Sequence, residues 1–326
     1  MSTLKQAILD AAAQDLAEIE SALKTNLNTY LDIVSQAAGH ILFSGGKRFR
    51  PLLMVLSARL CGYSGDYDKT FSTIFEYLHT ATLLHDDIVD EASLRRGKPV
   101  ANSIWGSATA VLVGDFLLAR SLSIAAETNK IKVVQAIGDV TEDMAQGEIH
   151  QLLNKGSIDL TEEEYKEVIR RKTASLIQGA CHTGALIADA APEQEKALAR
   201  FGLNIGFAFQ MADDLLDYTA DTETLGKTVG ADLREGKMTL PLIQTLKKAT
   251  PEDQKAIKAI IRNPDFSEDE FNALKRHLDT YGGIRYTTDL ATQYVDEAKN
   301  ALSIFDSSKT KDLMLMLADY TLQRNQ

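Results

Sequence analysis

The sequence predicts an all-α protein. Among its 326 residues only six are proline and 20 are glycine, and the helix formers Ala, Leu, Glu, Lys and Gln occur throughout. Val, Ile and Thr nowhere form the alternating stretches that half-buried strands require. The chain is long enough to bury a sizeable core as one large domain or two. Because no shift in composition divides it, we expect a single all-helical domain over residues 1–326.

Apolar periodicity and turn residues place the predicted helices in order along the chain. Two amphipathic helices come first and end at the glycine pair 45–46, and a long helix ends at the Arg-Arg-Gly-Lys-Pro segment 95–99. Residues 161–164 match a capping box. The predicted helices span residues 3–24, 28–43, 68–91, 101–127, 131–154, 162–189 and 193–219. A loop rich in Gly and Lys follows over 220–238, the polar stretch 250–270 reads as a connection, and further helices complete the chain.

Two Asp-Asp-x-x-Asp clusters lie within apolar helical runs. They comprise Asp86, Asp87 and Asp90, and Asp213, Asp214 and Asp217. Residues four apart share a helix face, so the first and third aspartates of each cluster lie one turn apart and repel each other. Mg²⁺ prefers such hard oxygen ligands together with the oxygens of a substrate phosphate. Acidic helix faces are usually solvated, but two such clusters are expected by chance in well under about 1% of chains this long. The clusters therefore predict magnesium sites that bind a diphosphate.

Basic residues gather in two places where anions could bind. Lys47, Arg48 and Arg50 follow the glycine pair, which lets the backbone approach a ligand closely. The spacing is not that of a P-loop. Arg95 and Arg96 follow the first aspartate cluster, and guanidinium groups bind phosphate oxygens in bidentate fashion. Either group alone is more often a solvated loop, but their place beside the acidic clusters of an acidic chain favours diphosphate binding.

Composition excludes several classes of function. The net charge of −11 argues against a nucleic-acid partner, because phosphate backbones demand a basic surface. Cys61 and Cys181 lack metal-ligand spacing and fit a reducing cytosol. The N-terminus lacks the pattern of a signal peptide, and no segment approaches about 18 uninterrupted apolar residues. We therefore expect a cytoplasmic protein, in contact with membranes at most peripherally when an apolar product is released.

Several motifs together carry a resemblance to a known family. They are the GGKRxRP stretch, HDDxxD followed by RRG, residues 114–116, 147–151 and 171–173, and FQxxDDxxD with a later Gly-Lys. In this order they resemble the trans-isoprenyl diphosphate synthase family, most closely the bacterial long-chain enzymes of the octaprenyl type. The resemblance implies a homodimer of helical subunits. Each subunit would be an isoprenoid-synthase bundle around a central cavity, with the two aspartate clusters facing one another at its mouth.

The resemblance also implies roles for individual residues. The metal would be bound by the six aspartates, with Asp86, Asp90 and Asp213 catalytic together with Lys172 and Lys227. Isopentenyl diphosphate would bind to Lys47, Arg50, His79 and Arg96. The allylic diphosphate would bind to Arg95, Lys172, Thr173, Gln210, Lys227 and Lys237. Gln210 as an ordinary helix-face amide and Lys237 as a solvated lysine are equally good interpretations. Asp87 and Asp214 point away from the shared faces and could support rather than ligate.

Product length is expected to depend on the helix face behind Asp86. This face comprises Ala81, Leu78, Tyr77 and Ile74, next to Thr82. Ala81 and Thr82 are small, so the predicted tunnel is open beyond fifteen to twenty carbons. The resemblance implies an octaprenyl product. Heptaprenyl, decaprenyl and shorter geranylgeranyl products stay open. A class I terpene cyclase and a noncatalytic regulatory subunit are weaker alternatives, because the second cluster is another DDxxD and all six aspartates are present.

Overall fold

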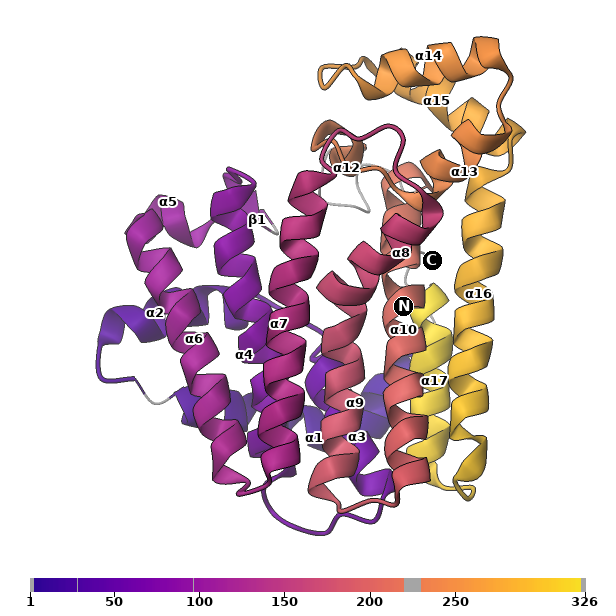
Figure 1. Ribbon diagram of the computed structural model, residues 1–326. Coiled ribbons are helices and arrows are strands. Elements are labelled where there is room, and N and C mark those ends of the chain that lie inside the picture. Colours follow the sequence, from indigo (N-terminus) through magenta and orange to yellow (C-terminus); the bar gives the residue numbers. More distant parts are fainter. Residues whose placement is uncertain (1–2, 28, 96, 220–229, 324–326) are drawn as a thin grey trace. The chain divides into compact units, whose positions relative to one another are not determined.

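The computed structural model describes residues 3–27, 29–95, 97–219 and 230–323, and this part of the chain is almost entirely helical, as predicted (Figure 1). The elements are α1 (Thr3–Leu27), α2 (Asp32–Leu42), α3 (Phe49–Leu60), α4 (Asp68–Val89), β1 (Leu94–Arg95), β2 (Lys98–Pro99), α5 (Ala101–Trp105), α6 (Ser107–Glu127), α7 (Ile131–Leu153), α8 (Glu162–Ile169), the π-helical turn η1 (Arg170–Ala174), α9 (Ser175–Ile187), α10 (Pro192–Thr219), α12 (Ala231–Arg234), α13 (Leu240–Lys248), α14 (Pro251–Ile261), α15 (Glu268–Thr280), α16 (Gly283–Ala301), the 3₁₀ turn η2 (Leu302–Ile304) and α17 (Lys309–Gln323). Strands β1 and β2 pair as a short antiparallel hairpin.

The chain forms two compact units. Unit 1 comprises Met1–Glu142, Leu176–Gly202 and Ala301–Leu317, and unit 2 comprises Asp143–Ser175, Leu203–Asn300 and Ala318–Gln326. Helices α7, α9, α10, α16 and α17 contribute residues to both units. The expected single domain over residues 1–326 stays a prediction. The first aspartate cluster belongs to unit 1 and the second to unit 2.

Helix α4 is the central helix of unit 1 and packs against α1, α3 and α6. Every residue of α4 from Phe71 to Leu78 is buried, the polar Ser72, Thr73 and Glu76 included, as expected of a helix enclosed by others. Phe75 and Tyr77 are among its completely buried side chains. The Tyr77 hydroxyl donates a hydrogen bond to the Leu23 carbonyl oxygen of α1 at 2.7 Å, so its polar end is satisfied inside the core. The end of α4 that carries the first aspartates is thereby anchored in the core.

Unit 2 has its own core, built around α10. Phe207, Met211 and Tyr218 of this helix are buried in one apolar cluster with residues of α8, α13 and α15. The Phe207 ring stacks on Tyr294 of α16 with a centroid distance of 4.7 Å. The Tyr218 hydroxyl lies 2.7 Å from that of Thr239. These contacts fix the helix that carries the second cluster.

The structure differs from the predicted elements in six places. The segment 95–99, expected only to end a helix, contributes to the β1–β2 hairpin. The described part of the expected loop 220–238 contains the short helix α12, and residues 220–229 of that loop lie outside the described residues. The expected helix 101–127 is divided at Gly106, whose φ of 83° no ordinary helical residue adopts. The helix expected over 162–189 contains the π turn. Helix α3 was not predicted, since its apolar residues follow no clear helical period. The stretch 250–270, expected to be a connection, holds α14 and the start of α15, because its polar residues are helix caps and an exposed face while Ile257, Ile260 and Ile261 are buried.

The capping box at the start of α8 is confirmed. The Thr161 hydroxyl accepts a hydrogen bond from the Glu164 backbone N–H, and the Glu164 carboxylate accepts one from the Thr161 backbone N–H at 2.8 Å. These bonds satisfy two donors that a helix start otherwise leaves unpaired. They fix where α8, and therefore the π turn after it, begins.

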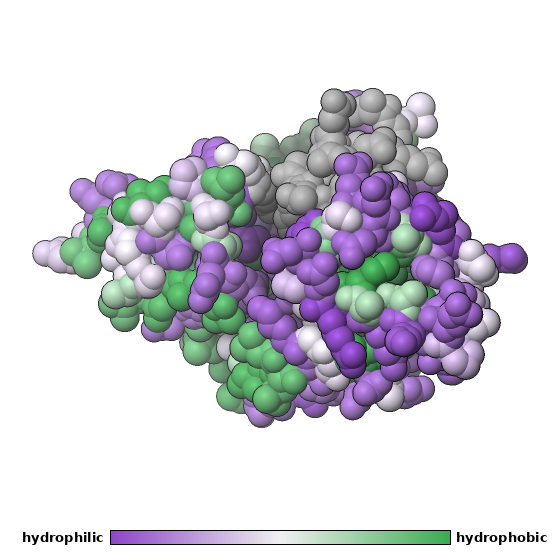
Figure 2. All heavy atoms as spheres, turned by 90° about the horizontal axis from the view of Figure 1, so that it is seen from above, coloured by the Kyte–Doolittle hydropathy of each residue, from purple (hydrophilic) through white to green (hydrophobic). Residues whose placement is uncertain are grey.

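Helix α6 is the one described helix that is long and apolar enough to cross a membrane, judged by length and composition only. It packs against α4 in unit 1, and 39% of its most apolar 18-residue window is buried inside the structure. Its outer face exposes apolar side chains, with Leu112 66% exposed and Val111 and Leu122 also exposed, and Asp115 is exposed on the same face. Figure 2 shows hydrophobic surface on the left, where α5 and α6 lie in Figure 1.

Candidate active site

The first aspartate cluster lies at the C-terminal end of α4. Asp90 follows the last helical residue, and its backbone N–H donates to the Asp86 carbonyl oxygen at 2.8 Å, so the two aspartates stay one turn apart. Both are half-buried. Asp87 is only 1% exposed, and its Oδ1 accepts hydrogen bonds from Arg95 Nε at 2.8 Å and Nη2 at 2.7 Å. The β1–β2 hairpin brings Arg95 back to α4, so this predicted phosphate ligand is paired with Asp87.

The second cluster repeats this pattern on α10. Asp213 is exposed, whereas Asp214 is 3% exposed. The Asp214 carboxylate accepts hydrogen bonds from the Tyr165 hydroxyl at 2.6 Å and from Gln210 Nε2 at 2.8 Å. Burial raises the pKa of Asp214, and the charge of Asp232 adds to the effect. The middle aspartate of each cluster is therefore held by the protein.

Asp217 plays a structural part that the sequence did not reveal. Its Oδ1 accepts a hydrogen bond from the Ala231 backbone N–H at 2.9 Å, and its Oδ2 accepts one from the Asp232 backbone N–H at 3.2 Å. These N–H groups belong to the first turn of α12, where a negative charge is favourable. Asp217 thus joins the second cluster to the start of α12.

The residues present fit a hard divalent cation bound in part by substrate. Among the described residues, no three His, Cys, Asp or Glu side chains come together closely enough to hold a metal ion. Carboxylate oxygens that are accessible at Asp86, Asp90 and Asp213 suit Mg²⁺, which completes its octahedral shell with water and phosphate oxygens. The Oδ2 atom of Asp87 is buried and has no hydrogen-bond partner among the described residues. The assignment of all six aspartates to metal binding stays a prediction, and Asp87 and Asp214 have the contacts of supporting residues.

The basic loop between α2 and α3 contains one cation that is not available to a ligand. Arg48 is 4% exposed, and its guanidinium group donates to Glu20 Oε1 at 2.5 Å, Glu76 Oε1 at 2.9 Å and the Leu42 carbonyl oxygen at 2.6 Å. Its φ of 46° is unusual for a residue other than glycine. Lys47 is exposed and Arg50 half-buried, so two of the three basic side chains reach the surface.

Glu76 connects this basic loop to α4. It lies on α4 one turn before His79, which is half-buried and was predicted to bind the same diphosphate as Lys47 and Arg50. The buried Arg48–Glu76 pair therefore links the basic loop to the helix that carries His79. Arg96, the fourth predicted member of this group, lies outside the described residues.

Lys172 and Thr173 lie in the π turn η1 of unit 2. Lys172 Nζ forms an ion pair with Glu148 of α7. The Thr173 hydroxyl donates to Gln210 Oε1 at 2.8 Å, and Gln210 in turn donates to Asp214. The predicted residues Thr173, Gln210 and Asp214 thus form one hydrogen-bonded chain. Both the Oε1 and the Nε2 atom of Gln210 have hydrogen-bond partners, and its assignment to the allylic diphosphate stays a prediction.

The predicted lysines after α10 are only partly described. Lys227 lies outside the described residues. Lys237 Nζ contacts Glu235 Oε2 at 2.6 Å and Asp232 Oδ1 at 3.6 Å. Because the Asp232 backbone N–H donates to Asp217, Lys237 is connected to the second cluster through Asp232. Its assignment to the allylic diphosphate stays a prediction.

The predicted tunnel wall is buried in unit 1. Ala81, Leu78, Tyr77 and Ile74 are all 0% exposed, and Thr82, nearer the aspartates, is half-buried. His85 lies over Gly114 of α6, where a Cβ atom would overlap the imidazole ring. Its Nε2 lies 3.2 Å from the Val111 carbonyl oxygen, which makes His85 a bridge between α4 and α6. Going back along α4 from its C-terminal end, the charged Asp86 is therefore followed within about two turns by the completely buried Ala81 and Leu78.

Three residues of the site were not found from the sequence. Tyr165 binds Asp214, Glu148 binds Lys172, and Glu76 binds Arg48. Glu148 lies in a motif that carried the resemblance, which gave a signal for it. Tyr165 and Glu76 have no local pattern, because their partners are distant in sequence.

An all-helical fold with two aspartate clusters, basic loops and an apolar interior defines the class of isoprenoid synthases. Within that class, the chain belongs to the polyprenyl synthetase family, whose model matches residues 31–278. The chain is a prenyltransferase of the trans-polyprenyl diphosphate synthase type.

Relatives and solved structures agree with this family. The chain is 38% identical over 318 residues to an octaprenyl diphosphate synthase of Escherichia coli (strain K12), covering 98% of each chain. It is 37% identical over 323 residues to an all-trans-nonaprenyl-diphosphate synthase (geranyl-diphosphate specific) of Rhodobacter capsulatus, covering 99% of this chain and 98% of the relative. The crystal structure of a polyprenyl synthase from Caulobacter crescentus CB15, complexed with calcium and isoprenyl diphosphate, matches with a TM-score of 0.91 and 38% identity, covering 98% of this chain and 97% of the other.

The Arg48 ion pairs predict a large loss of stability when the cation is removed. In Arg48→Met the Glu76 carboxylate stays buried without its cation, which is expected to lower the free energy of unfolding by about 3 kcal/mol. The matched control is Arg59→Met, because Arg59 pairs with Asp15 but is 42% exposed, and Lys69 remains 3.7 Å from Asp15. We expect the control to lose less than about 1 kcal/mol in urea unfolding. Equal losses of unfolding free energy in the two variants would show that the buried Arg48–Glu76 pair contributes no more to stability than the more exposed Arg59–Asp15 pair.

Proposed function

We propose that the protein adds isopentenyl diphosphate units head-to-tail to an allylic diphosphate, farnesyl or geranylgeranyl, and makes a long-chain all-trans polyprenyl diphosphate, octaprenyl diphosphate. The observation that carries this proposal is the arrangement of α4. Accessible carboxylates lie at its end, and a completely buried face with a small residue, Ala81, lies behind them. One helix thus offers a polar site for a diphosphate and apolar surroundings for the chain attached to it.

The proposed reaction separates charge and must be protected from water. The C–O bond between the allylic carbon and the diphosphate breaks, and the diphosphate leaves with the electron pair. The double bond of isopentenyl diphosphate attacks the resulting allylic cation and forms the new C–C bond. A proton is then lost from the added unit, and the departing diphosphate accepts it. Apolar side chains exclude water, which would otherwise capture the cation.

Basic residues stabilise the negative charge that develops on the leaving diphosphate. Arg95, Lys172, Lys227 and Lys237 are proposed for this role, with Thr173 as a hydrogen-bond donor and Gln210 as its support. Arg95 and Lys172 each have an acidic partner, Asp87 and Glu148. A bound diphosphate would compete with those carboxylates. Lys47, Arg50, His79 and Arg96 are proposed to bind isopentenyl diphosphate.

Magnesium is the proposed cofactor, with several ions bound together with the substrate. When bound, Mg²⁺ would neutralise the negative charge of the diphosphate and so help the C–O bond to the allylic carbon break. Asp86, Asp90 and Asp213 would hold it through their accessible oxygens. Asp87, Asp214 and Asp217 complete the predicted metal set, and their protein contacts support a role in orienting the accessible carboxylates.

A homodimer in the cytoplasm is the proposed state of the protein. The support is the outer face of α6, where Val111, Leu112 and Leu122 are exposed on one side of the helix. Exposed apolar residues on one face mark protein–protein interfaces, and a second copy would cover them. Substrates are small diphosphates, and contact with a membrane is peripheral and limited to product release.

The aspartate clusters predict a severe loss of activity without loss of fold. With isopentenyl diphosphate, farnesyl diphosphate and Mg²⁺, we expect Asp86→Ala or Asp213→Ala to lower the condensation rate by roughly 10³-fold or more, because transition-state charge loses its stabilisation. The control is Asp279→Ala, which removes an exposed carboxylate from α15. Circular dichroism checks that each variant keeps its helices. Near-normal turnover in either cluster variant would rule out the metal assignment, and no incorporation by the unmodified protein would favour a cyclase or a noncatalytic subunit.

The tunnel wall predicts a change in product length. A graded series at the buried position, Ala81→Val, Ala81→Leu and Ala81→Phe, is expected to shorten the product step by step while the first condensation persists. The larger side chains occupy the space that a growing chain needs. Reverse-phase chromatography of dephosphorylated products measures the length, and the unmodified protein should end near forty carbons. An unchanged distribution throughout the series would show that residue 81 does not line the tunnel.

The outer face of α6 predicts dimer dissociation after a charge is introduced. Leu112→Glu is expected to shift the mass measured by light scattering from that of a dimer to that of a monomer, because a buried carboxylate lacks a partner in the interface. The control is Leu94→Glu, at a residue that is 64% exposed on the β hairpin. A monomeric unmodified protein would refute the homodimer.

A further inference from the structure

The π turn η1 (Arg170–Ala174) lies between α8 and α9 and interrupts what is otherwise a regular helix. π turns are rare and have poorer backbone geometry than α-helices, and they occur most often at functional sites. Such a turn persists only where its surroundings hold it. In this structure it contains Lys172 and Thr173, whose side chains contact Glu148 and Gln210.

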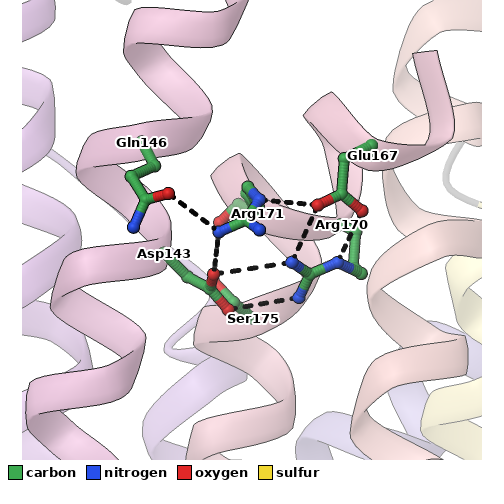
Figure 3. A network of polar contacts seen from close by, with 6 residues as sticks. All are labelled: Asp143, Gln146, Glu167, Arg170, Arg171 and Ser175. Carbon is green, nitrogen blue, oxygen red and sulfur yellow. Dashed lines mark hydrogen bonds and ion pairs between the residues drawn. The ribbon is translucent and has the colours of Figure 1, made fainter. Parts of the chain in front are cut away.

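Two arginines at the start of the turn share two carboxylates, as Figure 3 shows. Arg170 donates to Glu167 Oε2 at 2.8 Å and to Asp143 Oδ2 at 3.2 Å. Arg171 donates to Glu167 Oε1 at 2.6 Å and to Asp143 Oδ1 at 2.6 Å, with Gln146 Oε1 a further acceptor at 3.3 Å. Each carboxylate thus accepts from both arginines, and the four charges balance.

The two carboxylates have different positions in the fold. Glu167 lies on α8, one turn before the arginines, so its contacts stay within one helix. Asp143 lies on α7, so its contacts join α7 to the π turn (Figure 3). Hydrogen bonds from Arg170 and Arg171 lower the pKa of Glu167 to about 2, which keeps this carboxylate ionised at ordinary pH. Among the four charged residues drawn in Figure 3, Asp143 is the one on α7, so its pairs with Arg170 and Arg171 link the two elements, beside the ion pair between Lys172 and Glu148 of α7.

Gly147 brings α7 and the π turn into close contact. A Cβ atom at this position would lie 2.5 Å from the Lys172 backbone nitrogen and 2.8 Å from Arg171 Cβ. Only glycine leaves room for that approach. Asp143 and Gly147 are one turn apart on α7, so both act on the same face of the helix. Asp143 holds the π turn through its ion pairs, and Gly147 leaves room for the backbone of the π turn.

We propose that Asp143 is a positioning residue: through Arg170 and Arg171 it holds the π turn against α7 and so sets where Lys172 and Thr173 meet the allylic diphosphate. Gly147 serves the same contact by its lack of a side chain. The proposal rests on the proposed function, which assigns Lys172 and Thr173 to the leaving diphosphate. A small displacement of a group that stabilises a transition state costs up to about 10²-fold in rate.

The first test compares Asp143→Asn with Asp139→Asn, which removes an exposed carboxylate one turn earlier on the same helix. We expect Asp143→Asn to lower kcat by roughly 10- to 100-fold, while the KM for isopentenyl diphosphate changes less than about two-fold. Asp139→Asn should keep both constants. Glu167→Gln should have a smaller effect than Asp143→Asn, because the link to α7 remains. Equal kcat values for Asp143→Asn and Asp139→Asn would overturn the proposal.

A double-mutant cycle distinguishes positioning from a general loss of stability. If Asp143 acts through the π turn, Asp143→Asn should reduce kcat by less than about two-fold further when Lys172 and Thr173 are already alanine. Independent effects would multiply instead, and that result would overturn the proposal. Thermal unfolding in the same samples shows whether each variant is folded at the assay temperature.

Gly147→Ala gives an independent test that leaves every charge in place. It should lower kcat as Asp143→Asn does, whereas Gly138→Ala on the same helix should not, because no described atom lies within 4 Å of a Cβ atom there. Unaltered kcat in Gly147→Ala would contradict the proposed contact. The unmodified protein serves as the reference throughout: its failure to condense the substrates would refute the proposed function, whereas normal condensation with unaffected variants would refute the positioning role alone.

Discussion

The rest of this structure depends on one constraint: a carboxylate that is buried away from water must be paired. An unpaired buried carboxylate is unfavourable by several kcal/mol, yet each cluster places aspartates in a helix that must also form core. The fold meets this constraint by dividing the work. The first aspartate of each cluster is accessible, whereas the second is buried and held by Arg95 or by Tyr165 and Gln210. Hydrogen-bond donors of the protein thus stabilise the buried second aspartate of each cluster. The accessible first aspartate can bind a ligand.

The same constraint explains why residues distant in sequence matter. Asp87 needs the β hairpin that returns Arg95, and Asp214 needs α8, which begins at a capping box and supplies Tyr165. The basic loop between α2 and α3 is similar, since Arg48 is satisfied by Glu20 and Glu76 from two other helices. In each case a long polar side chain reaches across the core to a partner, and hydrogen bonds to charged groups make that contact strong.

Much of the fold and part of the site could be predicted from the sequence, because they depend on local spacing. Periodicity placed most helices within a few residues, and a four-residue spacing placed Asp86 and Asp90 on one face. The rest depends on contacts that spacing does not encode. The partner of Asp214 and the burial of Arg48 require tertiary packing. The sequence did not predict the division at Gly106, because an isolated glycine does not by itself show that a helix ends there. It did not predict the helices in 250–270, because their polar composition does not show which residues pack against the core.

The π turn has a consequence for how this helix tolerates change. Residues before it on α8 and after it on α9 follow helical repeats that are out of phase, because the wider turn contains an additional residue. Deleting one residue here would restore an ordinary helical repeat and rotate everything after it by about 100°. The buried face of α9, with Ile177, Ala180 and Cys181, would then turn away from its core. The length of this helix is therefore as tightly constrained as its composition.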